Sequence, residues 1–189
     1  MFSALSTILL AGTALSAPTP RAAAADSCVK RSQDMDLWSV DKFDFHASYT
    51  FSTPAHQNSW GYVNFTLGNP AVPASRPVCA AESNWLNDFF YGGGQVYACD
   101  TGDDGTTSAT WSFSRPSGEL RVNQTWECVD EGGRFEARGG VVLNLTCEEK
   151  EWTNPDWHQG SIYSTRNIDC NVVDAQAPVE EMSTVMRRV

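Results

Sequence analysis

Apolar and polar residues alternate along most of this chain, in short segments that lie between Trp38 and Cys170. The segment 40–51 places Phe43, Phe45 and Tyr49 at odd-numbered positions, with polar residues between them. Successive side chains of a strand point to opposite sides of a sheet, so this pattern predicts strands with one buried and one solvated face. The fold class is therefore predicted to be all-β.

Further strand-like segments follow at 60–67, 78–80, 95–100, 109–114, 119–128, 135–147 and 161–170. Turn-forming sequences such as Gly68-Asn69-Pro70 and Gly132-Gly133 separate them. About eight or more short strands with turns of this kind predict one compact antiparallel β-barrel or sandwich. The large aromatic residues expected to point inward are Trp38, Phe45, Trp60, Phe65, Trp111, Phe113 and Trp126.

Two segments lack this alternation. Residues 83–90 carry a capping Ser83 and apolar residues at helical spacing, so they are predicted to form the one short helix. From residue 171 the composition changes to Asp-Ala-Gln-Ala-Pro-Val-Glu-Glu, and 171–189 are predicted to be a disordered tail. The barrel domain is accordingly assigned to residues 28–170.

The first 17 residues are typical of a secretory signal peptide. An apolar centre from Leu5 to Leu15 is followed by small residues up to Ala17, which suits cleavage near Ser16 or Ala17. This apolar run is shorter than the roughly 18 residues of a membrane span. Residues 1–17 are predicted to be a signal peptide and 18–27 a flexible lead-in, so the protein is expected to be secreted and extracellular.

Cysteines and sequons agree with that compartment. The chain has six cysteines, all after the predicted signal, and none in a Cys-x-x-Cys pair. An even number of such residues favours disulfides in an oxidising compartment, although six cysteines allow 15 pairings. Asn-x-Thr sequons make Asn64, Asn123 and Asn144 candidate glycosylation sites.

The formal net charge is −10. Binding to nucleic acids and docking on anionic membranes both require clustered basic residues, so neither a nucleic acid nor a membrane is expected as a partner.

The sequence carries no recognisable motif for catalysis, a metal or a cofactor. The chain has no Gly-x-Ser-x-Gly sequence, and His46, His56 and His158 are isolated rather than spaced as metal ligands. Acidic pairs such as Asp130-Glu131 fall in predicted turns, where contact with solvent keeps the carboxyl groups ordinary acids. A glycosidase needs one carboxyl group with a raised pKa, so it is the weakest alternative. We expect no catalytic residue, no metal and no cofactor, and therefore a protein that is not an enzyme.

The candidate binding residues are Trp152, Trp157 and His158, in a predicted loop at 148–160. Exposed indoles could stack on a sugar ring or anchor a protein partner. Alternatively, both indoles could fold back as a lid on the end of the barrel.

Several motifs occur in a familiar order. They are Trp60-Gly61-x-x-x-Phe65, Cys79-x-x-x-Ser83, Phe90-Tyr91-Gly92 leading to Tyr97-x-Cys99, Phe113 before Leu120-x-Val122-x-Gln124-x-Trp126-x-Cys128, and Leu143-x-Leu145-x-Cys147 with Cys170. Over residues 28–170 the chain resembles the family of small secreted fungal proteins named after the major allergen of Alternaria.

This resemblance implies a compact β-barrel without catalytic machinery, secreted by filamentous ascomycetes. It implies disulfides Cys79–Cys99 and Cys147–Cys170, which leaves Cys28 and Cys128 to pair with each other. Some members join two protomers through the first cysteine, so a homodimer is left open.

Several members act on plants as effectors or defence elicitors. We therefore expect a non-enzymatic effector or elicitor that binds an extracellular host (plant) protein. The alternative is a carbohydrate-binding module that holds cell-wall glycan on exposed Trp of the 148–160 loop.

Overall fold

The computed structural model describes residues 27–84, 90, 93–102 and 105–186. The predicted signal peptide and all of the lead-in except Ser27 lie outside these residues. The elements are α1 (Cys28–Gln33), β1 (Leu37–Thr53), β2 (His56–Gly68), β3 (Val78–Ser83), β4 (Tyr97–Ala98), β5 (Thr107–Ser114), β6 (Glu119–Cys128), a 3₁₀ turn (Val129–Glu131), β7 (Gly133–Val142), β8 (Cys147–Thr153), β9 (Ser164–Cys170) and β10 (Val173–Met186).

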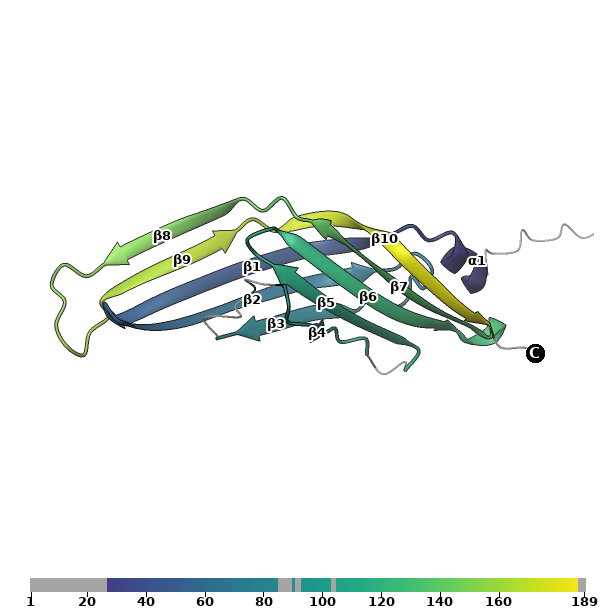
Figure 1. The fold of residues 1–189 in the computed structure, drawn as a ribbon, viewed down its shortest axis with the longest axis horizontal. Coiled ribbons are helices and arrows are strands. Elements are labelled where there is room, and N and C mark those ends of the chain that lie inside the picture. The colour runs from purple at the N-terminus through teal and green to yellow at the C-terminus, as the bar shows by residue number, and fades with distance from the viewer. Residues whose placement is uncertain (1–26, 85–89, 91–92, 103–104, 187–189) are drawn as a thin grey trace, which may run out of the picture.

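The strands form one antiparallel sheet that curls into a nearly closed barrel (Figure 1). Neighbouring strands follow the order β3-β2-β1-β10-β7-β6-β5-β4. The two ends of this path meet where Val78 pairs with Asp100. The predicted all-β antiparallel barrel is thus confirmed.

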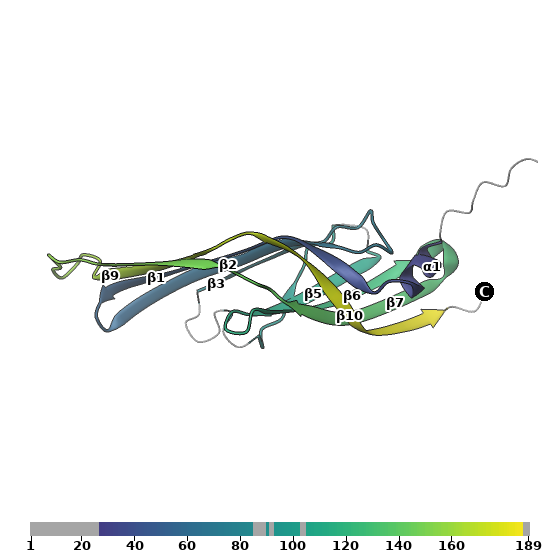
Figure 2. The same cartoon turned by 90° about the horizontal axis from the view of Figure 1, so that it is seen from above.

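Strand β1 belongs to two parts of the sheet. Its first half, up to Phe43, pairs with β10, and its second half, from His46 to Phe51, pairs with β9. Strand β9 in turn pairs with β8, so β8, β9, β1 and β2 continue beyond the barrel as a flat extension (Figure 2). The register of β1 shifts at a bulge where Lys42 has a φ of 56°.

The barrel interior is packed with aromatic rings, and three Trp, five Phe, two Leu and Ile168 are its largest fully buried side chains. Some polar atoms in the interior have hydrogen-bond partners. Gln124 Oε1 accepts hydrogen bonds from Trp38 Nε1 and from Asn69 Nδ2, each at 2.8 Å. This matters because a buried polar atom without a partner costs stability.

Of the seven aromatic residues expected inside, Trp60 is not. Its side chain is 45% exposed, whereas the other six are buried. Val63 and Phe65 of β2 face inward, so the residues that alternate with them face outward. Trp60 belongs to this outward set, together with Tyr62 and Asn64.

The helix expected at 83–90 is not confirmed. Ser83 ends strand β3, and residues 85–89 lie outside the described ones. The α-helix within the described residues is instead α1, at the start of the assigned domain. Ser27 caps it, and Glu131 accepts a hydrogen bond from the backbone N–H of Cys28 at 2.8 Å.

The prediction of a disordered tail at 171–189 is wrong, because 173–186 form strand β10. This strand pairs with β1 over residues 173–178 and with β7 over residues 179–186, and its Ala177 is buried. Apolar residues do alternate here, at Val173, Ala175, Ala177 and Val179, but small alanines make a weak pattern.

Three disulfides join Cys28 to Cys128, Cys79 to Cys99 and Cys147 to Cys170. The last two are the pairs that the family resemblance implied, and the first joins the two cysteines that remained. The first holds α1 against the end of the barrel, and the second joins β3 to the segment after β4, where the barrel closes. The third ties β8 to β9 at the base of the extension.

The close approach of β10 to β7 gives a direct test of this strand. A Cβ atom at Gly139 would lie 2.0 Å from the carbonyl oxygen of Pro178 on β10. We expect Gly139→Ala to lower the free energy of unfolding by about 3 kcal/mol, measured by urea titration. Gly94→Ala, where nothing lies within 4 Å, is the control and should change it by less than about 1 kcal/mol. Equal effects of the two substitutions would contradict the placement of β10.

Candidate functional site

The flat extension has one face on which polar and aromatic side chains gather, which we call the His46 face. The strand register places His46 between Tyr62 of β2 and Asp169 of β9, and Ser48 between Trp60 and Asn167. Strand β8 adds alternate residues at the edge. The face comprises Asp44, His46, Ser48, Trp60, Tyr62, Asn64, Glu148, Lys150, Trp152, Asn167 and Asp169.

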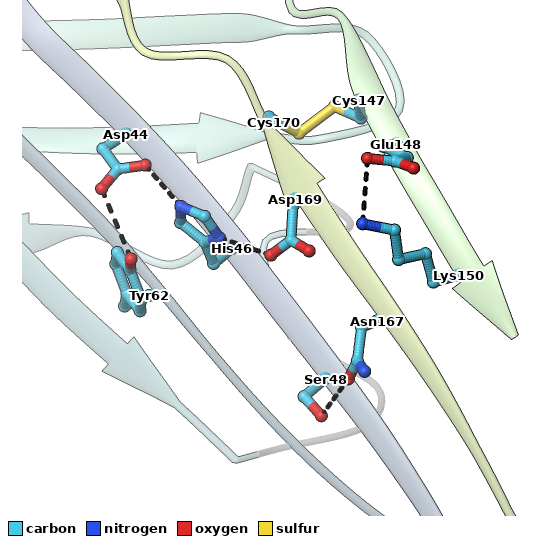
Figure 3. Close-up of polar contacts among 10 residues, drawn as sticks. All are labelled: Asp44, His46, Ser48, Tyr62, Cys147, Glu148, Lys150, Asn167, Asp169 and Cys170. Atoms are coloured by element: carbon cyan, nitrogen blue, oxygen red, sulfur yellow. Dashed lines mark hydrogen bonds and ion pairs between the residues drawn. A yellow bond between two sulfur atoms is a disulfide. The ribbon is translucent and has the colours of Figure 1, made fainter. Parts of the chain in front are cut away.

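His46 is held between two carboxylates (Figure 3). Its Nε2 lies 2.8 Å from Oδ1 of Asp44, and its Nδ1 lies 2.8 Å from Oδ1 of Asp169. The Nδ1–Asp169 contact is a hydrogen bond, whereas the Nε2–Asp44 contact is a close approach without hydrogen-bond geometry. Because Asp44 and His46 belong to β1 and Asp169 to β9, the imidazole links the two strands in addition to their backbone pairing.

Tyr62 completes this cluster from the other side. Its ring stacks on the imidazole of His46 with centroids 5.0 Å apart, and its hydroxyl donates to Oδ2 of Asp44 at 3.4 Å. Burial of the phenol, together with the nearby Asp44 carboxylate, raises the pKa of Tyr62 above its ordinary value of 10.0. The phenol thus stays a neutral donor at neutral pH.

Next to this cluster lie one side-chain pair between β1 and β9 and one within β8. Ser48 Oγ donates to Oδ1 of Asn167 at 2.7 Å, and Lys150 Nζ lies 3.1 Å from a carboxylate oxygen of Glu148 (Figure 3). The Cys147–Cys170 disulfide lies at the end of the same two strands. The disulfide and the backbone pairing therefore hold β8 to β9, and the Ser48–Asn167 bond adds a link from β9 to β1.

Two indoles stand open on this face. Trp60 is 45% exposed and Trp152 is 50% exposed. They come from the two outer strands of the four-stranded extension and are offset by two residues along the strands, which places them roughly 16 Å apart at about 4.8 Å per strand and about 3.4 Å per residue. Trp60 also contacts Tyr62, with ring centroids 5.4 Å apart. The result is a flat aromatic surface with a polar centre.

The residues predicted for binding separate in the structure. Trp152 lies on strand β8, so the loop expected at 148–160 begins only after Thr153. Trp157 lies in that loop and is anchored, because its Nε1 lies 3.2 and 3.1 Å from the carbonyl oxygens of Ser52 and Ser161. His158 is exposed in the same loop. Trp157 therefore folds back on the tip of the extension, whereas Trp152 stays open.

The three sequons also lie in different settings. Asn64 is exposed on the His46 face, Asn144 is exposed in the segment between β7 and β8, and Asn123 is half-buried on β6.

The opposite side of the extension is held by ion pairs. Oε1 of Glu149 lies 2.8 Å from a guanidinium nitrogen of Arg115, and Oε2 lies 2.5 Å from one of Arg166. A hydrogen bond from Arg166 is the main cause that lowers the pKa of the Glu149 carboxyl. This carboxylate is engaged in structure and is not free to act as a general acid.

Among the described residues, no three His, Cys, Asp or Glu side chains converge as a metal site. No helix among them is long and apolar enough to cross a membrane. Ser52 Oγ lies 3.0 Å from Nδ1 of His56, but this pair is exposed at the β1–β2 turn. The arrangement on the His46 face is suited to recognition through stacking, hydrogen bonds and charge.

Sequence reasoning missed the centre of this face, namely Asp44, Asp169, Trp60 and Tyr62, and treated His46 as an ordinary polar strand residue. The alternation along β2 could have shown where Trp60 and Tyr62 point, because they lie on the same side of the strand as the polar Asn64. The contact between His46 and Asp169 has no such signal, since 123 residues separate them.

The Tyr62–Asp44 contact predicts a pH effect. Because the folded-state pKa is raised, neutral Tyr62 supports folding below pH 10, and this support is lost as the pH rises through the raised value. Asp44→Asn removes the carboxylate charge and should lower the pKa of Tyr62, measured by near-ultraviolet absorbance during alkaline titration. Tyr62→Phe identifies the transition, and Asp156→Asn in the exposed loop should leave it unchanged. An unchanged Tyr62 transition in Asp44→Asn would contradict the contact.

Comparison with known proteins identifies the family. A search of curated proteins and a search of solved structures each find no match. The family model described as Alternaria alternata allergen 1 matches residues 40–170. The match runs from near the start of β1 to the end of β9 and so includes every strand of the His46 face. The chain belongs to the Alternaria alternata allergen 1 family.

Proposed function

We propose that this chain is a secreted, non-enzymatic effector or elicitor that binds an extracellular plant protein through its His46 face. The observation that carries the proposal is the pair of open indoles, Trp60 and Trp152, on a flat and internally braced sheet. Membership in the allergen family supports the assignment as a non-enzymatic effector or elicitor, and the chemistry of the His46 face supports the kind of partner.

The shape of the face suits a protein partner. Protein interfaces have aromatic anchors at well-packed positions, surrounded by a polar rim. On the His46 face, Trp60, Tyr62 and Trp152 provide such anchors, and Asn167 and Lys150 lie between them. The disulfide and the cross-strand contacts hold these groups in place before binding, which reduces the ordering cost of association.

Charge favours a basic partner surface. Asp44, Asp169 and Glu148 contribute three carboxylates to the face, against the single ammonium group of Lys150. The chain as a whole carries a formal charge of −10. Complementary charge speeds encounter and selects partners, so we expect Lys and Arg on the surface that is bound.

Secretion is part of the proposal. Three disulfides fit an oxidising export route, and the predicted signal peptide at 1–17 and the three sequons point the same way. Cys28 is paired internally with Cys128, so any homodimer would be non-covalent at this position.

The test combines leaf infiltration with capture of plant apoplastic proteins on the immobilised domain. The captured protein is identified and its Kd is measured against the wild type and single variants. Trp60→Ala and Trp152→Ala should each weaken binding about thirty-fold, as expected for an anchor worth about 2 kcal/mol. Val142→Ala, which changes an apolar residue on the barrel that is more exposed than either Trp, is the control and should leave the Kd unchanged.

Two results would contradict the proposal. One is the absence of both a defence response and a captured plant protein. The other is a captured protein whose Kd is unaffected by both Trp substitutions, since its binding site would then lie elsewhere.

The second candidate function is carbohydrate binding, which the exposed indole of Trp152 favours. A sugar ring can stack on a flat indole while its hydroxyl groups bond to amide and carboxylate side chains such as Asn167 and Asp169. Binding on an array of cell-wall glycans that is lost in Trp152→Ala would support this function. Trp157→Ala is a useful comparison, because that indole is anchored to the backbone of Ser52 and Ser161. An array without any binding would exclude the alternative.

A further inference from the structure

A groove of about 460 Å³ lies on the outer surface of the barrel, across β5, β6, β7 and β10, away from the His46 face. Its volume is within the range of roughly 300–1,000 Å³ of clefts that hold small molecules. The residues that line it are mostly polar or charged and include Thr110, Ser112, Arg121, Asn123, Arg138 and Glu180.

The sheet beside the groove has a position without a side chain. Strand β7 carries Gly140 opposite Arg121, and a Cβ atom there would lie 2.4 Å from the carbonyl oxygen of Leu120. No side chain can therefore occupy this position on the sheet. Strand β10 shifts its register beside it, between Val179 and Glu181.

Ion pairs fix the walls. Arg121 Nη1 lies 2.6 Å from Oε2 of Glu180, which connects β6 to β10 across β7. Arg138 Nη2 lies 2.7 Å from Oε1 of Glu136. The groove thus has charged walls whose shape is set by contacts within the protein.

Asn123 lies in this groove and belongs to the sequon Asn123-Gln124-Thr125. The register places it between Thr110 and Arg138. We propose that Asn123 carries an N-linked glycan and that the first sugars of this glycan occupy the groove.

The chemistry of attachment is that of N-glycosylation during export. Nδ2 of Asn123 forms a bond to the anomeric carbon of an oligosaccharide. The bond from that carbon to the diphosphate of a lipid-linked donor breaks, and Nδ2 releases one proton with the lipid diphosphate as leaving group. The glycosylated amide keeps one N–H, which can still donate toward Oε1 of Glu136, now 3.5 Å from Nδ2.

The lining matches the groups of the first sugars. Hydroxyl and acetamido groups need both donors and acceptors, which the guanidinium of Arg138, the carboxylate of Glu180 and the hydroxyl of Ser112 supply. Val96, 61% exposed, adds an apolar contact suited to an acetyl methyl group. A glycan here would leave the groove closed to other ligands.

The first experiment measures occupancy. The full chain is secreted from a eukaryotic host that makes high-mannose glycans, and glycopeptides are mapped by mass spectrometry. We expect a glycan at Asn123 that is absent in Thr125→Ala and retained in Thr125→Ser, which keeps the sequon. Asn123→Gln provides a second variant if Thr125→Ala is secreted poorly. An unmodified Asn123 in the secreted wild type would overturn the proposal.

The second experiment measures whether the groove holds the glycan. An endoglycosidase that cuts between the first two sugars should release the Asn123 glycan at least ten-fold more slowly from the folded protein than from the reduced, denatured chain. Arg121→Ala, which breaks the ion pair to Glu180, should speed release from the folded protein. Glycans at the exposed Asn64 and Asn144, where occupied, serve as comparators with no groove. Equal release rates from folded and denatured protein would overturn the placement of the sugars in the groove.

Discussion

The rest of the structure depends on the change of partner along β1. Up to Phe43 this strand is paired with β10 and completes the barrel wall, and from His46 onward it is paired with β9 and carries the extension. The change occurs at a bulge where Lys42 has positive φ, a conformation that costs roughly 1–2 kcal/mol outside glycine. The backbone N–H of Lys42 donates to Oδ1 of Asp174 at 2.8 Å, which holds the bulge against β10.

This arrangement separates two tasks. The barrel buries the large aromatic side chains and supplies the stability, while the extension presents side chains on both of its faces and encloses no core of its own. The extension is braced by the His46 cluster on one face and by the Arg115–Glu149–Arg166 ion pairs on the other. A thin sheet held in this way suits recognition, because its exposed aromatic groups stay in place without being buried.

The pattern of the sequence predicts much of the barrel. Alternation places Phe45, Phe65 and Trp126 inside, and it does so because each strand has one solvated face. The same rule, applied to β2 with the correct phase, places Trp60 outside. Strand β10 was missed because its inward residues include Ala175 and Ala177, whose small side chains give a weak contrast with their neighbours.

The candidate site was less predictable, for a physical reason. Local pattern fixes which side of a strand a residue occupies, but not which strands become neighbours. The His46 cluster requires β1 to pair with β9, and its two parts are 123 residues apart in the chain. The cysteine pairs came from the resemblance to a family, since six cysteines alone allow 15 pairings.

Amide hydrogen exchange at single-residue resolution tests the continuity of β1 most directly. If one strand serves both the barrel and the extension, the paired amides on both sides of the bulge, from Trp38 to Phe51, will be protected in the native protein. Their partners in β9 will be protected too, whereas the outer edge of β8 will exchange quickly. Fast exchange of residues 46–51 alongside slow exchange of residues 38–43 would contradict the account, because the extension would then not be a folded part of the sheet.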